Sequence, residues 1–110
     1  MLNDQAEPES IMNLKEHLLV CLAEEGSEVA QSADKALRFG IDDVNVLNPE
    51  GPDNQQRLID EINDLIAVVR LCAIHRLLPI HWEDESKQAA KMGKVEKFMA
   101  YARSKGTLVD

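Results

Sequence analysis

The chain has 110 residues, a formal net charge of −8 and only 4% aromatic residues, while Leu, Ile, Val and Ala are plentiful. This length allows one modest core and β-forming residues are scarce, so we expect one all-α domain over residues 1–110, a helical bundle of three to five helices. The negative charge argues against nucleic-acid binding, because a phosphate backbone is bound by an excess of Lys and Arg.

Residues 1–9 are acidic and polar, and we expect them to form a flexible N-terminus. They contain no apolar run of the signal-peptide type. No stretch of about 18 consecutive apolar residues occurs in the chain, so a membrane span is not expected either. The sequence therefore predicts a cytoplasmic protein without a membrane partner.

Two long helices are predicted in the first three quarters of the chain. Ser10 can cap a helix that begins at Ile11 and runs to Gly40, which is a good left-handed terminator after Phe39. Residues 41–53 contain two Pro, one Gly and several Asp and Asn, which is typical of an irregular connection. A second helix is predicted from about Asn54 to about Leu78. Residues 65–74 of this helix are apolar nearly all round, so we expect a partner subunit to cover part of it.

A third, basic helix is predicted over residues 84–106. This segment has six basic and three acidic residues, a net charge of +3, whereas residues 1–83 carry a net charge of −10. Three lysines of the segment fall within about 60° of one another on a helix, so they could bind substrate phosphates: Lys87, Lys91 and Lys94. A solvated helix face that pairs with the acidic remainder is the alternative interpretation.

Acidic residues interrupt the apolar stripes of the first two helices. At 100° per residue, Glu25 and Glu61 each lie in the middle of a core-facing stripe, and Glu28 and Asp64 lie about 60° to one side of them. Glu24 lies further out. The pattern acid, acid, x, x, acid thus occurs once in each helix, and it predicts that four carboxylates converge between the two helices.

Ionised carboxylates that face an apolar interior need compensation, because burial of an unpaired charge is very costly. The acids could be protonated, could pair with basic residues or could bind divalent cations. Only Arg57 and His75 are basic on the same stripes, which is too few to neutralise four carboxylates. All-oxygen ligation favours Mg²⁺, or Mn²⁺, over zinc. A solvated acidic face remains the alternative, but it does not explain why two acids occupy the centres of two apolar stripes.

The motifs EEGSE (residues 24–28) and EIND (residues 61–64) resemble the EExxE and ExxD motifs of the MazG-like all-α nucleoside triphosphate pyrophosphohydrolases. The resemblance covers about residues 14–78 and implies a helical-bundle homodimer or homotetramer. It also implies Mg²⁺-dependent hydrolysis of a nucleoside triphosphate to the monophosphate and pyrophosphate, in control of the nucleotide pool. The metal ligands would be Glu25, Glu28, Glu61 and Asp64, and Glu24 would support the ligands or assist the attacking water together with Glu25.

Substrate identity is left open by the sequence. Lys35 and Arg38, at the end of the first helix, are further candidates for phosphate contacts. Among enzymes, a diphosphatase that acts on dUTP or dCTP is an alternative within the same superfamily. Outside enzymes, the alternative is a non-catalytic helical interaction module whose binding surface is the apolar second helix.

Overall fold

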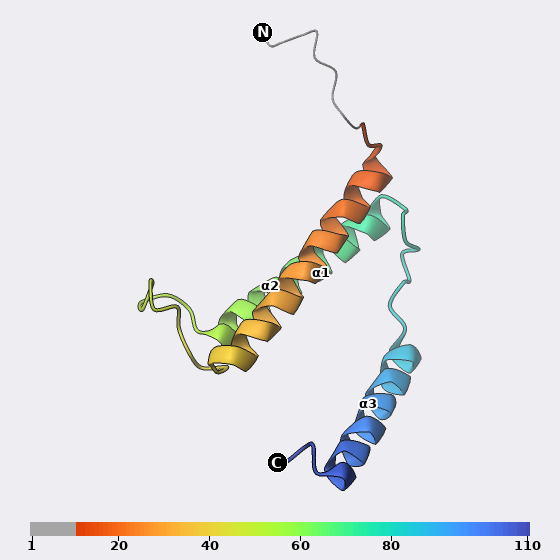
Figure 1. Cartoon of the computed structure of the whole chain (residues 1–110). Coiled ribbons are helices and arrows are strands. Elements are labelled where there is room, and N and C mark those ends of the chain that lie inside the picture. The colour runs from red at the N-terminus through yellow and green to blue at the C-terminus, as the bar shows by residue number, and fades with distance from the viewer. Residues whose placement is uncertain (1–10) are drawn as a thin grey trace. The chain divides into compact units, whose positions relative to one another are not determined.

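The computed structural model of the chain describes residues 11–110 and forms three helices in the order α1 (Leu14–Phe39), α2 (Asn54–Ile74) and α3 (Glu85–Lys105) (Figure 1). Within residues 11–110 there is no β-strand, only an isolated bridge between Val44 and Asp53. The predicted all-α class is therefore confirmed for the described part of the chain. The predicted flexible N-terminus, residues 1–9, and the Ser10 cap lie outside the described residues.

Helix α1 begins at Leu14, and not at Ile11 as predicted. Asn13 forms a capping box with Glu16: the Asn13 side chain accepts a hydrogen bond from the Glu16 amide at 2.9 Å, and the Glu16 carboxylate accepts one from the Asn13 amide at 3.1 Å. These bonds fix the helix start three residues later than predicted. The helix ends at Phe39, as predicted, because Gly40 adopts a φ of 104° that side-chain-bearing residues avoid.

The connection between α1 and α2 folds back on itself and starts α2 in a defined position. The Asn54 amide donates a hydrogen bond to the Asp43 carbonyl, and the Asn54 side chain donates one to the Gly40 carbonyl, each at 2.8 Å. Asn54 is only 8% exposed, so both of these polar groups are satisfied inside the protein. Asp53 caps α2 by accepting a hydrogen bond from the Gln56 amide.

Helix α2 ends at Ile74, four residues before the predicted end at Leu78. Arg76 adopts a positive φ of 62°, its amide bonds to the Ala73 carbonyl and the Leu77 amide bonds to the Cys72 carbonyl. This is the hydrogen-bond pattern of a Schellman motif, with Arg in the position that glycine usually takes. The sequence offers no glycine here, so the prediction extended the helix to the residue before Pro79.

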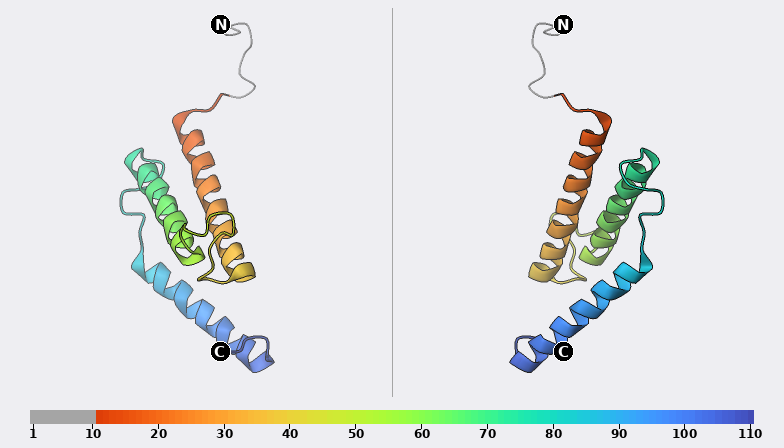
Figure 2. Two further views of the ribbon diagram at one scale, coloured as in Figure 1. Left: turned by 90° about the vertical axis from the view of Figure 1, so that its left-hand side faces the viewer. Right: turned by 90° about the vertical axis from the view of Figure 1, so that its right-hand side faces the viewer.

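Helices α1 and α2 pack side by side as an antiparallel pair (Figures 1 and 2). The core of the described residues is very small: Leu18 is 3% exposed, Cys72 is fully buried and Ala73 is 6% exposed. Several large apolar side chains of α2 stay exposed, among them Ile59 at 44% and Ile62 at 39%. The pair alone thus leaves much of its apolar surface uncovered, as the apolar character of the second helix predicted.

The chain divides into two compact units, one that ends at Ile80 and one that comprises His81–Asp110. The second unit contains α3, whose bounds agree with the prediction. Asp84 caps the start of α3 by accepting a hydrogen bond from the Lys87 amide. This hydrogen bond is the main reason that the Asp84 pKa is lowered. Gly106 ends α3 with a positive φ of 79°. None of the α3 residues is buried.

No described helix combines the length and the apolar composition that a bilayer crossing requires.

Candidate metal centre

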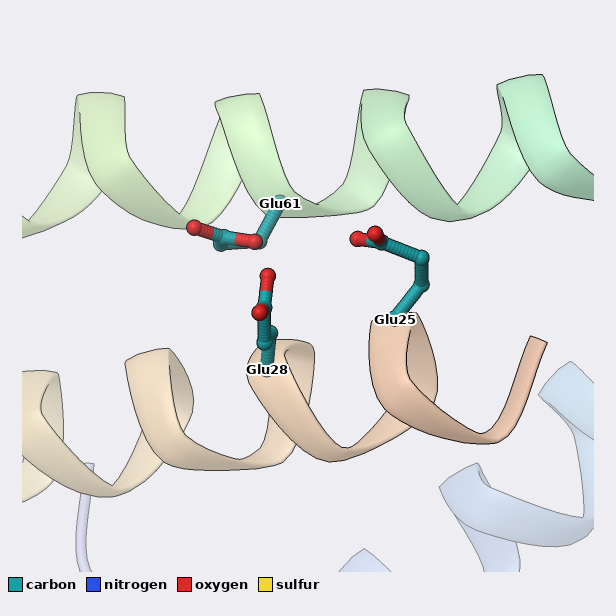
Figure 3. Close-up of side chains that lie close together, drawn as sticks. All are labelled: Glu25, Glu28 and Glu61. Atoms are coloured by element: carbon teal, nitrogen blue, oxygen red, sulfur yellow. The ribbon is translucent and has the colours of Figure 1, made fainter. Parts of the chain in front are cut away.

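Three of the predicted acids come together between α1 and α2 (Figure 3). Glu25 and Glu28 lie one turn apart on α1, and Glu61 lies on α2 with its carboxylate directed at Glu28. Carboxylate oxygens of the three residues all lie within 4.8 Å of one another. We call these three residues the carboxylate cluster. Its members come from both predicted motifs, so packing of the two helices is what assembles it.

Two oxygens of the carboxylate cluster are shielded from solvent and have no hydrogen-bond partner. They are Oε2 of Glu25 and Oε2 of Glu61. Both residues are partly exposed as a whole, so each side chain enters the space between the helices with one oxygen and leaves the rest near the surface. Buried polar atoms in folded proteins nearly always have a partner, so a donor or a cation that reached these two acceptors would satisfy them.

The electrostatics of the cluster also favour a positive partner. The Glu25 pKa is raised, first by loss of solvation and then by the negative charges of Glu28, Asp64 and Glu24. The Glu61 pKa is raised, first by a side-chain hydrogen bond with Glu28 that requires a proton between the two carboxyls, and then by loss of solvation. A proton partly relieves the repulsion between the acids, and a divalent cation would relieve it more completely.

The other two predicted acids lie at the margin of the carboxylate cluster. Asp64 is exposed, and it lies close enough for its charge to raise the pKa of both Glu25 and Glu61, but it is not one of the three residues whose oxygens converge. Glu24 is exposed too and acts on Glu25 through its charge alone.

A cavity of about 200 Å³ adjoins Glu61 and has basic side chains in its wall. Lys35 of α1 and Arg57 of α2 both line it, together with Ser32, Pro52 and Asp60. Arg57 is held at the α2 start, where its Nε donates a hydrogen bond to the Pro52 carbonyl at 3.4 Å. We call this space the basic cavity. It places the positive charges of Lys35 and Arg57 next to the carboxylate cluster, in a wall that also includes the carboxylate residue Asp60.

From the sequence, Arg57 is only one of two basic residues on the acidic stripes, too few to neutralise four carboxylates. The sequence feature that could have identified Arg57 as a site residue is its position one turn before Glu61 on the same stripe of α2. Its approach to Lys35 could not be read from the sequence, because it depends on how the 41–53 connection returns α2 to the end of α1.

The remaining predicted phosphate contacts are Arg38 on α1 and three lysines on α3. Arg38 forms an ion pair with Asp34 at 3.6 Å, and its guanidinium lies over the Phe39 ring, 4.9 Å from the ring centre. It does not line the basic cavity. Three lysines lie exposed on α3, in the other unit of the chain: Lys87, Lys91 and Lys94.

No family model matches the chain, and searches of curated proteins and of solved structures likewise returned no match.

The residues of the carboxylate cluster fit a hard divalent cation. They offer oxygen donors only, from acids on two helices, and two of the oxygens are already desolvated and unpaired. Mg²⁺ and Mn²⁺ prefer such ligands, whereas zinc prefers His and Cys, which the cluster lacks. These donors are of the kind that a hard divalent cation takes, and Asp64 is a further carboxylate whose charge acts on Glu25 and Glu61.

Proposed function

We propose that this protein hydrolyses a nucleoside or deoxynucleoside triphosphate to the monophosphate and pyrophosphate, with Glu25, Glu28, Glu61 and Asp64 as ligands of Mg²⁺ or Mn²⁺. The observation that carries the proposal is the pair of buried, unpartnered oxygens on Glu25 and Glu61 inside a cluster of three carboxylates. The resemblance of the two acidic motifs to those of the MazG-like pyrophosphohydrolases supplies the choice of reaction.

The proposed reaction needs charge neutralisation, a positioned substrate and an activated water. When bound, the divalent cation would neutralise phosphate charge and make a water molecule more acidic. Glu25 and Glu61 would orient the ligand set, because their inward oxygens are held between two packed helices. Glu24, exposed and one residue before Glu25, would accept the proton of the attacking water.

Lys35 and Arg57 would bind the phosphate oxygens that extend from the carboxylate cluster into the basic cavity. A guanidinium can form two parallel hydrogen bonds with a phosphate, whereas the lysine ammonium acts as a point charge. Lys87, Lys91 and Lys94 of α3 are proposed as further steering charges. No covalent intermediate is required, because the water attacks phosphorus directly.

A homodimer or homotetramer in the cytoplasm is part of the proposal. Exposed apolar side chains on α2 support it, because Ile59, Ile62 and Ile66 recur at helical spacing and all remain at least 36% exposed. A second subunit that packs on this stripe would complete the helical bundle. The same observation favours the rival function, a non-catalytic interaction module that uses α2 as its binding surface.

A screen of the four ribonucleoside and four deoxyribonucleoside triphosphates for pyrophosphate release, with Mg²⁺ and with Mn²⁺, tests the proposal. Pyrophosphate release that requires the metal supports it. Pyrophosphate release confined to dUTP or to dCTP would instead indicate the diphosphatase alternative. A normal oligomer without any turnover or metal response would favour the interaction module.

A further inference from the structure

A second cavity adjoins the basic cavity, and Glu61 does not line it. It has a volume of about 230 Å³, and its wall includes Phe39, Val44 and Val46. Both cavities are lined by Lys35, Asn54 and Arg57, so the two spaces meet at these residues. The carboxylate cluster is therefore followed along the surface by basic side chains and then by an apolar hollow.

The apolar hollow matches one aromatic ring system in size. Its volume is below the range of about 300–1,000 Å³ in which drug-sized ligands bind, so it suits one part of a nucleotide and not the whole molecule. The Phe39 ring lines it and is 57% exposed, while the Arg38 guanidinium lies over the ring, 4.9 Å from its centre. A base that stacks on Phe39 would extend this guanidinium–ring stack.

Polar groups at the rim of the hollow can form hydrogen bonds with the edge of a base. Asp43 is fixed by its backbone, because its carbonyl accepts a hydrogen bond from Asn54 at 2.8 Å and its amide donates one to Gly40 at 3.3 Å. Asp43 is one of the residues that line the hollow, and a carboxylate can accept hydrogen bonds. Asn45 Oδ1 accepts a hydrogen bond from the Leu47 amide, which leaves the Asn45 Nδ2 group as a donor.

We propose that this hollow binds the base of the substrate by stacking on Phe39, and that Asp43 makes it prefer bases with an exocyclic amino group. The inference rests on the proposed function. With the α-phosphate at Lys35 and Arg57 and the β- and γ-phosphates at the carboxylate cluster, the nucleoside end of a triphosphate is directed into the hollow. Water then attacks the β-phosphorus, the bond from this phosphorus to the oxygen shared with the α-phosphate breaks, and the monophosphate leaves while pyrophosphate forms. An amino group of cytosine, adenine or guanine would donate to the Asp43 carboxylate, whereas uracil and thymine present a carbonyl oxygen at the equivalent position.

Substitutions of the exposed Phe39 ring separate base binding from phosphate chemistry. For Phe39→Leu we expect the KM of the preferred triphosphate to rise about tenfold or more, because stacking on an aromatic ring is lost. Phe39→Trp keeps an aromatic ring at this position, so its KM should equal that of the wild type. Val46→Ser, at a residue that is 84% exposed, provides a second cavity variant with little risk to folding. Leu47→Ser, one residue further along the same connection, is the control that should leave KM unchanged, since Leu47 does not line the hollow.

Binding of inorganic pyrophosphate with Mg²⁺, measured by calorimetry, distinguishes the two proposals. We expect it to be the same in wild type and Phe39→Leu, because pyrophosphate has no base. An unchanged KM in both Phe39→Leu and Val46→Ser would overturn the inference while leaving the proposed function intact. Absence of turnover in the wild type would overturn the proposed function, and this inference with it.

The role of Asp43 has its own measurement. The ratio of kcat/KM for dCTP to that for dUTP should exceed one in the wild type, and Asp43→Asn should bring it to one or below. A ratio that Asp43→Asn leaves unchanged would overturn the assignment of Asp43.

Discussion

Glu28 of α1 and Glu61 of α2 direct their carboxylates at one another across the interface of the two helices, with oxygens of both within 4.8 Å of each other and of Glu25 (Figure 3). Two ionised carboxylates at this separation repel, and a hydrogen bond between them requires a shared proton. Either a proton shared by the two carboxyls or a bound cation can therefore stabilise the pair. Both ways lead to measurable predictions.

The first prediction concerns pH in the absence of metal. The Glu61 pKa is raised above its ordinary value of 4.5, and the main cause is the hydrogen bond with Glu28. A carboxyl group whose pKa is raised by folding stabilises the folded state at pH values below its ordinary pKa. This stabilisation is lost as the pH rises through the raised pKa. Glu61→Gln removes the titrating group. In EDTA, the melting temperature of this variant relative to that of the wild type should therefore rise between pH 4.5 and pH 7. A difference between the two proteins that does not vary with pH would contradict this.

The second prediction concerns addition of metal at neutral pH. A ligand that binds only the folded state stabilises it by about 2.7 kcal/mol when its concentration is a hundred times its Kd. Mg²⁺ or Mn²⁺ should therefore raise the melting temperature of the wild type in a thermal scan. Glu25→Gln and Glu61→Gln should respond weakly or not at all, whereas Glu50→Gln, in the exposed connection between α1 and α2, should respond like the wild type. Equal responses in all four proteins would mean that the metal binds elsewhere.

The third prediction concerns Arg57. Hydrogen bonds to charged groups contribute about 1.5–3 kcal/mol, so Arg57→Ala should raise the KM for a triphosphate roughly tenfold or more. Arg57→Lys should recover only part of this loss, because it keeps the charge but not the planar group. Arg70→Ala, an exposed arginine further along α2, is the matched control with an unchanged KM. The assignment of Arg57 would fail if the Ala variants of both arginines had the same KM.

The fourth prediction concerns Gly26, which lies within α1 immediately after Glu25. A Cβ atom at this position would have no heavy atom within 4 Å, so alanine fits the helix. Alanine is favoured over glycine in a helix by about 0.5–1 kcal/mol, and Gly26→Ala should increase the free energy of unfolding by about this amount in urea titration. A loss of stability would instead indicate that a second subunit packs closely against α1 at Gly26.

The helices and the convergence of the acids could be predicted from the sequence to a useful degree. Helical periodicity placed Glu25 and Glu61 on inward-facing stripes, since a 3.6-residue repeat is a local property of the chain. The helix ends at Asn13 and Ile74 could not be predicted as well. Asn13 competes with Ser10 as a cap, and the end of α2 depends on Arg76 adopting a positive φ, which its residue type does not favour.

The cavities depend on tertiary contacts that leave no local signal. The connection after Gly40 is tied to the start of α2 through Asn54, and this brings Lys35 and Arg57 to the same space. A helical wheel treats each helix separately, so it cannot show that a residue near the end of one helix meets a residue near the start of the next. The reaction itself rests on the resemblance of the acidic motifs, because carboxylate geometry selects a cation and not a substrate.

Pyrophosphate release by wild type and Glu61→Gln, measured side by side with the preferred triphosphate and Mg²⁺, tests the central claim most directly. Because Glu61 supplies one of the two buried, unpartnered oxygens, we expect Glu61→Gln to remain folded and to lose nearly all metal-dependent turnover. Circular dichroism and the oligomeric state of the variant provide the control for folding. Wild-type rates of pyrophosphate release by a folded Glu61→Gln variant would contradict the claim that this carboxylate cluster holds the catalytic metal.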